Sequence, residues 1–332
     1  MKNMKAWVKE LPQMKKALPI LSFPSISLLN VSVRELIGDS DLQAKGMQMI
    51  AEKTDSAASV SLMDLSVEAE CFGAQVRFSD DEVPTVTGRL INDMEEAEAL
   101  EVPAVGAARS GLYVDSIRKA AKLINDRPVF AGIIGPFSLA ARLLDVSEIM
   151  MDCYDDPDMV HLVLRKCTDF LIAYAKAYKE AGADGVMMAE PVAGLLSPSL
   201  EAEFSAPYVK EIVDAVQDDD FALVYHNCGD NVLAMTDSIF GIGAAAYHFG
   251  NSIDLAEMLK KAPADVIVMG NVDPAGVLRM GAAEQVEAAT RGVLEACSGY
   301  ANFVVSSGCD IPPQTPWTNL DTFFETVKKF YE

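Results

Sequence analysis

Histidine and cysteine are scarce in this chain, with three and six residues, and one of each stands in the run "LVYHNCGD", residues 223–230. His226 and Cys228 are two positions apart, and side chains so spaced on an extended segment point the same way, so both can face one ion. Imidazole nitrogen and thiolate sulfur suit zinc, and a catalytic zinc takes three protein ligands and keeps a fourth position for substrate or water. Cys309 is the candidate third ligand. Free cysteine is also among the most buried residue types, so core packing is the alternative interpretation.

The composition indicates a globular protein with a large core. Of 332 residues, 50% are hydrophobic and 23% are charged, which leaves no case for a disordered chain. A formal net charge of −22 disfavours nucleic acid and anionic membranes as partners. Neither a membrane-spanning run nor the uninterrupted apolar core of a signal peptide is evident. We therefore expect a cytoplasmic protein whose cysteines are reduced thiols or metal ligands rather than disulfides.

From about residue 128 onward, short apolar runs alternate with longer helical patterns. The runs are "VFAGIIGP", "GVMMAEP", "FALVYHNCG", "AAAYHFGN", "VIVMGNVDP" and "FVVSSGCDIPP". Continuous apolar runs are typical of a parallel sheet that is buried on both faces and connected by helices. Two earlier candidates, "LPILSF" and "SAASVSLMD", bring the strands to the eight that a closed barrel needs.

We therefore predict an α/β fold, a single (β/α)8 TIM barrel domain that covers residues 1–332. The barrel is expected to have an N-terminal elaboration and, at about residues 66–110, an excursion of strands and loops after strand two. An open doubly wound sheet is the alternative. No strand is followed by a convincing G-x-G-x-x-G, so dinucleotide binding has little support.

In a barrel, the residues that end the strands lie on the C-terminal rim, where barrel enzymes place their chemistry. In chain order these endings are Asp64, Glu190, His226 with Cys228, His248 with Asn251, Asn271 with Asp273, and Cys309 with Asp310. Because the last strand closes on the first, the fold can bring Cys309 close to His226 and Cys228. The sequence thus predicts that chemically capable side chains gather at one face.

Several motifs carry a resemblance to a known family. They are "IGPFSLAARLL", "LLSPSLEAEFSAPYVKEIVDAV", "HNCGD", "YHFGNSIDLAEML", "MGNVDPAGVL" and "SSGCDIPPQTPWTNL". Together they resemble the uroporphyrinogen decarboxylase superfamily and, within it, the zinc-dependent methylcobamide:coenzyme M methyltransferases and their corrinoid-linked relatives. The resemblance covers nearly the whole chain and implies a barrel with an H-x-C…C zinc motif at its mouth. Carried over, that motif falls on His226, Cys228 and Cys309.

The resemblance also implies an activity, the transfer of a methyl group from a corrinoid to a small thiol such as coenzyme M. Coordination to Zn²⁺ deprotonates a thiol, and the thiolate can attack the methyl group of methyl-Co(III), which leaves Co(I) and a methyl thioether. The chain has no D-x-H-x-x-G motif for cobalamin, so a separate corrinoid carrier protein is the expected partner. Another thiol or tetrahydrofolate is left open as the methyl acceptor.

Two other functions are alternatives. Uroporphyrinogen decarboxylases use no metal and hold a substrate with many carboxylates, which calls for arginines near the N-terminus in a signature resembling R-x-A-G-R. This chain has no arginine before Arg34, which favours the methyltransferase. The other alternative is a barrel in which zinc is structural or a corrinoid is merely bound.

The remaining rim residues are expected to support the site. Glu190 is a candidate proton acceptor or resting zinc ligand, or else a carboxylate bonded to a backbone amide. Asp64, Asn271 and Asp273 are expected to orient the zinc ligands or line the corrinoid approach. Asp273 precedes a proline, which also suits the start of a helix. His248 either supports the cofactor site or is a satisfied core residue.

The sequence does not identify a fourth zinc ligand. The stretch "YHFGNS" has Gly250 and Asn251 where relatives can carry an acidic ligand. Glu190, His248 or a water are the candidates to complete the site at rest. We expect the substrate thiol to bind at this position.

Overall fold

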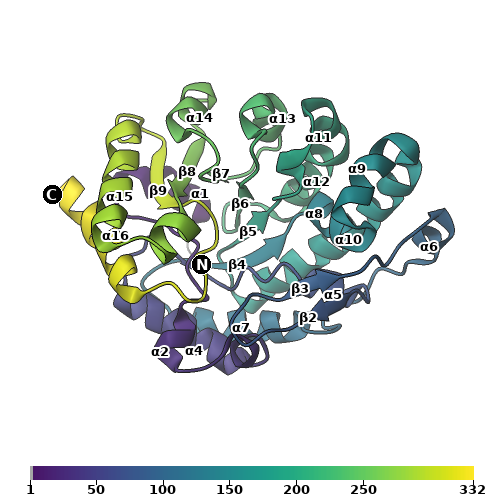
Figure 1. The fold of residues 1–332 in the computed structure, drawn as a ribbon, viewed down its shortest axis with the longest axis horizontal. Coiled ribbons are helices and arrows are strands. Elements are labelled where there is room, and N and C mark those ends of the chain that lie inside the picture. The colour runs from purple at the N-terminus through teal and green to yellow at the C-terminus, as the bar shows by residue number, and fades with distance from the viewer. Residues whose placement is uncertain (1–2) are drawn as a thin grey trace.

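Seven parallel strands form one curved sheet at the centre of the structure, a computed structural model that describes residues 3–332 (Figure 1). Their order across the sheet is their order in the chain: β1 (Ser59–Val60), β4 (Val129–Ile134), β5 (Gly185–Ala189), β6 (Ala222–Asn227), β7 (Ala246–Phe249), β8 (Ile267–Val272) and β9 (Phe303–Ser307). Each connection therefore crosses to the neighbouring strand, whereas the order of a doubly wound sheet reverses at a switch point. The predicted barrel class is confirmed, and the doubly wound alternative is wrong.

The predicted first strand, "LPILSF", takes the expected place but is not a regular strand. Leu18 N–H donates to Val305 O of β9 at 3.0 Å. On the other side, Ala57 N–H, just before β1, donates to Ala17 O at 2.8 Å. The segment 17–20 therefore bridges the first and last strands of the sheet, and we call it the closing segment.

A proline explains why the closing segment does not continue the ladder. Pro19 has no N–H to donate, so it interrupts the backbone hydrogen bonds of a strand. The next N–H, of Ile20, is bonded by a side chain, since Ser307 Oγ accepts it at 3.1 Å. The prediction of eight regular strands is therefore wrong by one, because the proline breaks the pairing on which a regular strand depends.

Helices cover the outer face of the sheet (Figure 1). They are α4 (Ser40–Lys53), α7 (Ser110–Leu123), α8 (Pro136–Leu144), α9 (Val146–Asp155), α10 (Pro157–Ala181), α11 (Pro198–Phe204), α12 (Ala206–Val216), α13 (Thr236–Gly241), α14 (Leu255–Lys261), α15 (Ala283–Cys297) and α16 (Trp317–Tyr331). Capping residues mark their ends. The longest, α10, begins after Asp156, which accepts the N–H of Met159 at 3.3 Å, and ends at Gly182, whose φ of 103° favours glycine.

Strand residues alternate between two apolar clusters. Met187 and Val224 belong to an inner cluster that fills the barrel, and Met188 and Tyr225 to a larger one beneath the helices. Successive side chains of a strand point to opposite faces. His226, two residues after Val224, therefore faces the barrel interior, and the alternation that fills the core also aims this residue at the site.

The chain between β1 and α7 forms the predicted excursion at residues 66–110. It contains α5 (Val67–Cys71), α6 (Met94–Ala99) and an antiparallel hairpin of β2 (Gln75–Arg77) and β3 (Thr85–Thr87). The predicted strands and loops are confirmed, with two short helices added. The predicted N-terminal elaboration is α1 (Met4–Glu10) with η1 (Leu11–Met14), and Met4 N–H donates to Asp219 O at 2.7 Å.

The remaining elements are short. They are α2 (Ser25–Leu29), α3 (Val33–Ile37) and the helical turns η2 (Ala193–Leu195), η3 (Val232–Ala234) and η4 (Pro274–Arg279). Within residues 3–332, no helix has both the length and the apolar character needed to span a bilayer.

Glu68 in α5 is a buried carboxyl group that should contribute to the pH dependence of stability. Its Oε1 accepts the N–H of Ile134 at 3.0 Å, and burial raises its pKa from 4.5 to about 7. Between pH 4.5 and about 7 the folded protein therefore keeps a proton on Glu68 that the unfolded chain has released. The contribution of Glu68 to the free energy of unfolding is fully present below pH 4.5 and is lost as the pH rises to about 7. In urea unfolding, Glu68→Gln should flatten this fall by about 1–3 kcal/mol between about pH 4.5 and 7. The exposed Glu52→Gln is the control, and an unchanged slope in Glu68→Gln would contradict the assignment.

Candidate metal centre

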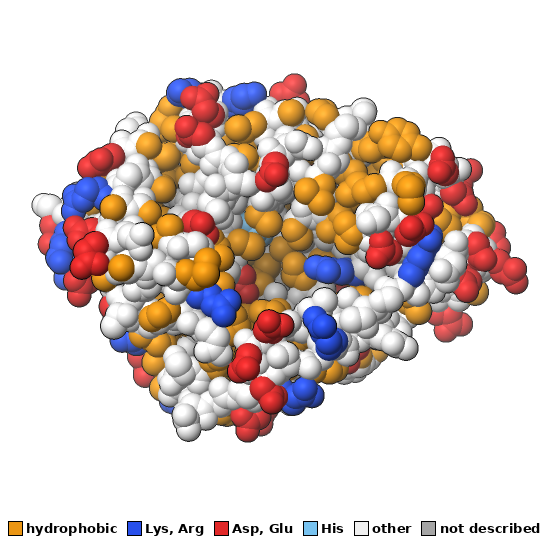
Figure 2. Space-filling view, viewed as in Figure 1, with side chains coloured by type: hydrophobic (Ala, Val, Ile, Leu, Met, Phe, Trp, Pro, Cys, Tyr) orange, Lys and Arg blue, Asp and Glu red, His pale blue; other side chains and the backbone are white. Residues whose placement is uncertain are grey.

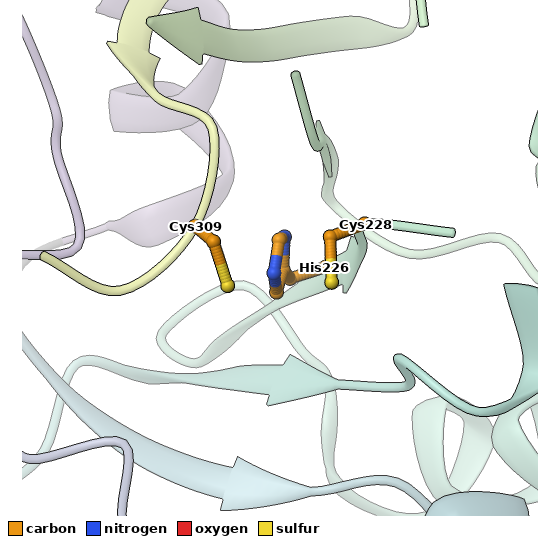
Figure 3. A group of neighbouring side chains, drawn as sticks. All are labelled: His226, Cys228 and Cys309. Carbon is orange, nitrogen blue, oxygen red and sulfur yellow. The ribbon is translucent and has the colours of Figure 1, made fainter. Parts of the chain in front are cut away.

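Three side chains from two strand ends meet at the C-terminal rim of the barrel (Figure 3). His226 lies in β6, Cys228 follows that strand, and Cys309 follows β9. Their candidate ligand atoms, one imidazole nitrogen and two sulfurs, all lie within 4.8 Å of one another. Zinc bonds of about 2.0–2.3 Å place tetrahedral ligands about 3.5–4 Å apart, so a small contraction would let all three bind one ion. We call these residues the His/Cys cluster.

The two thiols of the cluster interact directly. A hydrogen bond with Cys309 lowers the pKa of Cys228, and the same bond, followed by burial, raises the pKa of Cys309 to about 12. The pair therefore loses its first proton more easily than its second, because the remaining S–H stabilises the first thiolate. A divalent cation would replace both protons, since only the thiolate is a metal ligand.

The imidazole of His226 has one free nitrogen. The ring is buried, and its Nε2 has no hydrogen-bond partner within residues 3–332. Burial of a polar nitrogen without a partner costs free energy. An ion shared with Cys228 and Cys309 would satisfy this atom, so the residues present fit a metal.

A histidine pair supports His226 from behind. His226 and His248 are register partners on β6 and β7, and their Nδ1 atoms lie 2.8 Å apart. His248 Nε2 lies 2.7 Å from Ser306 Oγ, and Ser306 Oγ donates to Leu18 O at 2.7 Å. Burial lowers the pKa of His248 well below its usual value. His248 is therefore a neutral ring that touches a cluster member without joining the cluster.

Close packing around Cys228 explains the glycine in "YHFGNS". A Cβ added to Gly250 would lie 2.6 Å from Cys228 Cα, closer than real Cβ contacts allow. Residue 250 therefore has no room for an acidic side chain. Asn251 is exposed, and its Oδ1 packs against Gly308, so this stretch supplies no carboxylate to the cluster.

Asp64 lies apart from the His/Cys cluster, in a buried polar group of its own. Arg109 Nη1 forms an ion pair with its Oδ2, and Tyr113 donates to the same oxygen at 2.7 Å. Ser66 Oγ donates to Oδ1 at 2.6 Å. These contacts join the end of β1 to α7 and the excursion.

Glu190 is placed in the backbone-bonded arrangement, one of its two expected alternatives. Its carboxylate accepts the N–H of Phe137 at 2.8 Å and both the N–H and Oγ of Ser138, at 3.1 and 2.9 Å. Burial raises its pKa to about 8, and these hydrogen bonds partly oppose the rise. The side chain therefore holds the start of α8, and within residues 3–332 it is not among the candidate ligands.

Asn271 and Asp273 organise loops at the same rim. Asn271 Nδ2 donates to the carbonyl oxygens of Gly250 and Ile253, at 2.9 and 3.0 Å. Asp273 Oδ1 accepts two backbone N–H groups at the start of η4, each at 2.9 Å. Asp273 is thus a cap, the helix-start alternative raised from the sequence, and Asn271 fixes the loop that packs on Cys228.

A small cavity of about 60 Å³ opens beside the cluster. Its walls are Ile20, Met63, Leu65, Ala189, Pro191, His226, Cys228, Cys309 and Asp310. Figure 2 views the molecule from the same direction as Figure 1 and shows hydrophobic side chains around a central hollow. Burial raises the pKa of the Asp310 carboxyl well above its usual value, and its Oδ1 has no hydrogen-bond partner within residues 3–332. A ligand here would meet an apolar surface beside the cluster.

A second cavity adjoins the first, since Met63 and Leu65 line both. Arg142 of α8 also lines it. The Nε of Arg142 is buried without a hydrogen-bond partner within the described residues, and burial lowers the pKa of its guanidinium. An anionic group in this cavity would satisfy a cation that the protein leaves free.

Three polar residues of this region were missed in the sequence, although each has a local signal. Arg142 is the single charge in the apolar helix "PFSLAARLL", and Ser306 is polar inside the buried run "FVVSS". Arg109 has the weakest signal, because its partner Asp64 comes from a distant part of the chain. A charged or polar residue in an apolar run deserves a search for its partner.

A curved parallel sheet with reactive side chains at its C-terminal rim is the arrangement of (β/α) barrel proteins. The chain belongs to the uroporphyrinogen decarboxylase (URO-D) family, whose sequence profile matches residues 14–330. The predicted superfamily is thereby confirmed.

The similar proteins come from two branches of that family. The methylcobamide:CoM methyltransferase MtbA of Methanosarcina mazei is 34% identical over 280 residues, which cover 80% of this chain and 78% of the relative. The uroporphyrinogen decarboxylase of Coxiella burnetii is 28% identical over 289 residues, 82% of this chain and 77% of the relative. A solved methyltransferase from Methanosarcina mazei superposes with a TM-score of 0.86 over 98% of each chain, and its 24% identity supports the fold alone.

Proposed function

We propose that this protein is a zinc-dependent methyltransferase that moves a methyl group from a methylated corrinoid carrier protein to a small thiol of the coenzyme M kind. The observation that carries the proposal is the His/Cys cluster, in which two thiols and an imidazole nitrogen lie within 4.8 Å of one another, together with a buried His226 Nε2 that has no hydrogen-bond partner within residues 3–332. The likeness to methylcobamide:CoM methyltransferase MtbA supports the same reaction over tetrapyrrole decarboxylation.

The proposed ligands are His226, Cys228 and Cys309. They would hold a zinc ion, and the chemistry it would supply is a lower pKa for the acceptor thiol, so that the thiolate form is present at neutral pH. The apolar walls of the cavity exclude water, which would otherwise solvate the thiolate and weaken it as a nucleophile. The reaction forms a carbon–sulfur bond and leaves the electron pair of the cobalt–carbon bond on the corrinoid.

The supporting residues have structural roles in this proposal. His248 touches a ligand, while Asn271 fixes the loop behind Cys228. Glu190 and Asp64 hold α8 and the excursion around the cavity, and they act on the site through these elements. Asp273 starts η4 at the rim, where the carrier protein would approach.

The size of the cavity bears on where the corrinoid of the methyl donor would bind. A space of about 60 Å³ can accept the reactive end of a thiol but is far too small for a corrinoid ring. The corrinoid must then stay at the open rim.

We propose a cytoplasmic setting, because all six cysteines are free and reduced thiols persist there.

Arg142 suggests the chemical class of the thiol. Arg142 lines the cavity that adjoins the cluster, and its Nε has no hydrogen-bond partner within residues 3–332, so a short thiol could bind with its sulfur at the cluster and an acidic tail at the guanidinium. A hydrogen-bonded charge pair contributes about 1.5–3 kcal/mol, which corresponds to about 10- to 100-fold in affinity.

A methyl transfer assay with free methylcobalamin tests the proposed function. The wild-type protein should methylate 2-mercaptoethanesulfonate and convert the corrinoid to Co(I). Arg142→Ala should raise the KM for this thiol about 10- to 100-fold and leave that for neutral 2-mercaptoethanol nearly unchanged. Absence of thiol methylation, together with coproporphyrinogen formation from uroporphyrinogen, would establish the decarboxylase instead.

A further inference from the structure

The unusual feature of the site is the chain of hydrogen bonds behind His226, which runs through His248 and Ser306 to Leu18. We propose that His248 and Ser306 are positioning residues that fix the tautomer of His226, with the proton on Nδ1 and the lone pair on Nε2. The consequence for metal binding rests on the proposed function, whereas the tautomer itself is a property of the metal-free protein.

The direction of the chain is set at its far end. The hydroxyl of Ser306 donates its single proton to Leu18 O at 2.7 Å, and a backbone carbonyl oxygen only accepts. Toward His248, Ser306 Oγ can then act only as an acceptor. The Nε2 of His248, 2.7 Å away, must therefore carry a proton.

The next step passes through the His248 ring. This side chain is fully buried, and its two nitrogens contact Ser306 Oγ and His226 Nδ1. Within the described residues these two contacts involve no carboxylate, and burial disfavours a charged ring. With its proton on Nε2, its Nδ1 is a lone pair that accepts from His226 Nδ1 at 2.8 Å.

A second contact leads independently to the same assignment. The carbonyl oxygen of His248 lies 3.3 Å from His226 Nδ1, and this oxygen also only accepts. Both neighbours of His226 Nδ1 thus require a proton on that nitrogen. In a neutral ring the lone pair is then on Nε2, which has no hydrogen bond of normal geometry within residues 3–332, while the ring lies beside the Cys309 thiol.

The chain also ties the site to the closing segment. Leu18 N–H pairs with β9, and its carbonyl accepts from Ser306 on the same strand. The protein therefore uses the segment that bridges its first and last strands as the anchor for a candidate metal ligand. A metal-binding histidine is generally fixed through its other nitrogen in this manner, and loss of such a partner costs about 10- to 100-fold in metal affinity.

The test is ¹⁵N NMR of the imidazoles in the full-length, metal-free protein. With three histidines in the chain, the three rings can be assigned by single substitutions. We expect lone-pair shifts for His226 Nε2 and His248 Nδ1, and protonated shifts for His226 Nδ1 and His248 Nε2. A proton on His226 Nε2 in the wild type would overturn the proposal, and this measurement requires no variant to fold.

Variants of Ser306 then test the effect on Zn²⁺ binding. In Ser306→Ala, His226 should no longer be held in one tautomer, and the protein should bind Zn²⁺ about 10- to 100-fold more weakly. Ser306→Thr keeps a hydroxyl, so it should keep both the single tautomer and the Zn²⁺ affinity of the wild type. Ser307→Ala is the matched control, because Ser307 Oγ accepts the N–H of Ile20 in the closing segment, and the substitution keeps the Ser307 backbone that lies beside His248.

The outcomes separate this inference from the proposed function. Equal Zn²⁺ affinities in Ser306→Ala and Ser307→Ala would overturn the positioning role while leaving the zinc site in place. The predicted shifts in a wild-type protein that binds no Zn²⁺ would support the tautomer assignment and refute the zinc enzyme.

Discussion

Cys309→Ser should remove the metal and the methyl transfer activity together. The substitution replaces one of three candidate ligands with a hydroxyl, which does not ionise as a thiol does and is a poor zinc ligand. We expect zinc to fall from about one equivalent to less than about half, and methyl transfer from methylcobalamin to fall more than about 100-fold. Elemental analysis and the methyl transfer assay measure the two effects.

Cys71→Ser is the control for this substitution. Cys71 is a half-buried free thiol like Cys309, but its Sγ contacts Ala107 O and lies outside the His/Cys cluster. The control should keep its zinc and its activity. A Cys309→Ser protein with a full equivalent of zinc would rule out the proposed ligand set.

Arg109→Met should be among the most destabilising substitutions in the barrel. The side chain of Asp64 is 0% exposed and that of Arg109 13%, so the variant leaves a carboxylate buried without its cation. Breaking a buried ion pair from one side costs about 3–5 kcal/mol. Urea unfolding measures the loss, and Asp64→Asn in the same chain should recover part of it, because the unpaired charge is then gone.

Arg165→Met is the matched control for Arg109. Arg165 pairs with Glu211 at the surface, where both side chains are more than 40% exposed, and such pairs contribute about 0–1 kcal/mol. Similar losses in the two variants would show that the Asp64–Arg109 pair behaves as a surface pair.

The proximity of the residues in the His/Cys cluster was predicted from the strand pattern together with the family resemblance. Continuous apolar runs predicted the strands, and the two-residue period then placed His226 and Cys228 on one side. A barrel can bring Cys309 close to this pair, but the resemblance to the methyltransferases was needed to favour it as third ligand over core packing. The structure places its sulfur within 4.8 Å of the other two candidate ligand atoms.

Other features depend on contacts between distant segments, which a single sequence does not specify. Pro19 was the only sequence signal that the closing segment would not pair as a strand. The hydrogen bond that Ser307 Oγ accepts from Ile20 N–H is known only from the structure. The sequence left the role of Glu190 open, and its contact with the start of α8 involves residues far away in the chain. The Arg109 partner of Asp64 likewise lies far along the chain, at the end of the excursion.

X-ray absorption at the zinc edge, with and without 2-mercaptoethanesulfonate, tests the central claim most directly. Without thiol, we expect two sulfur neighbours at about 2.3 Å and one imidazole nitrogen at about 2.0–2.1 Å. With thiol, the zinc should gain a third sulfur neighbour, because the acceptor binds at the open position. A sulfur count that is unchanged by the thiol would contradict thiol activation by the metal.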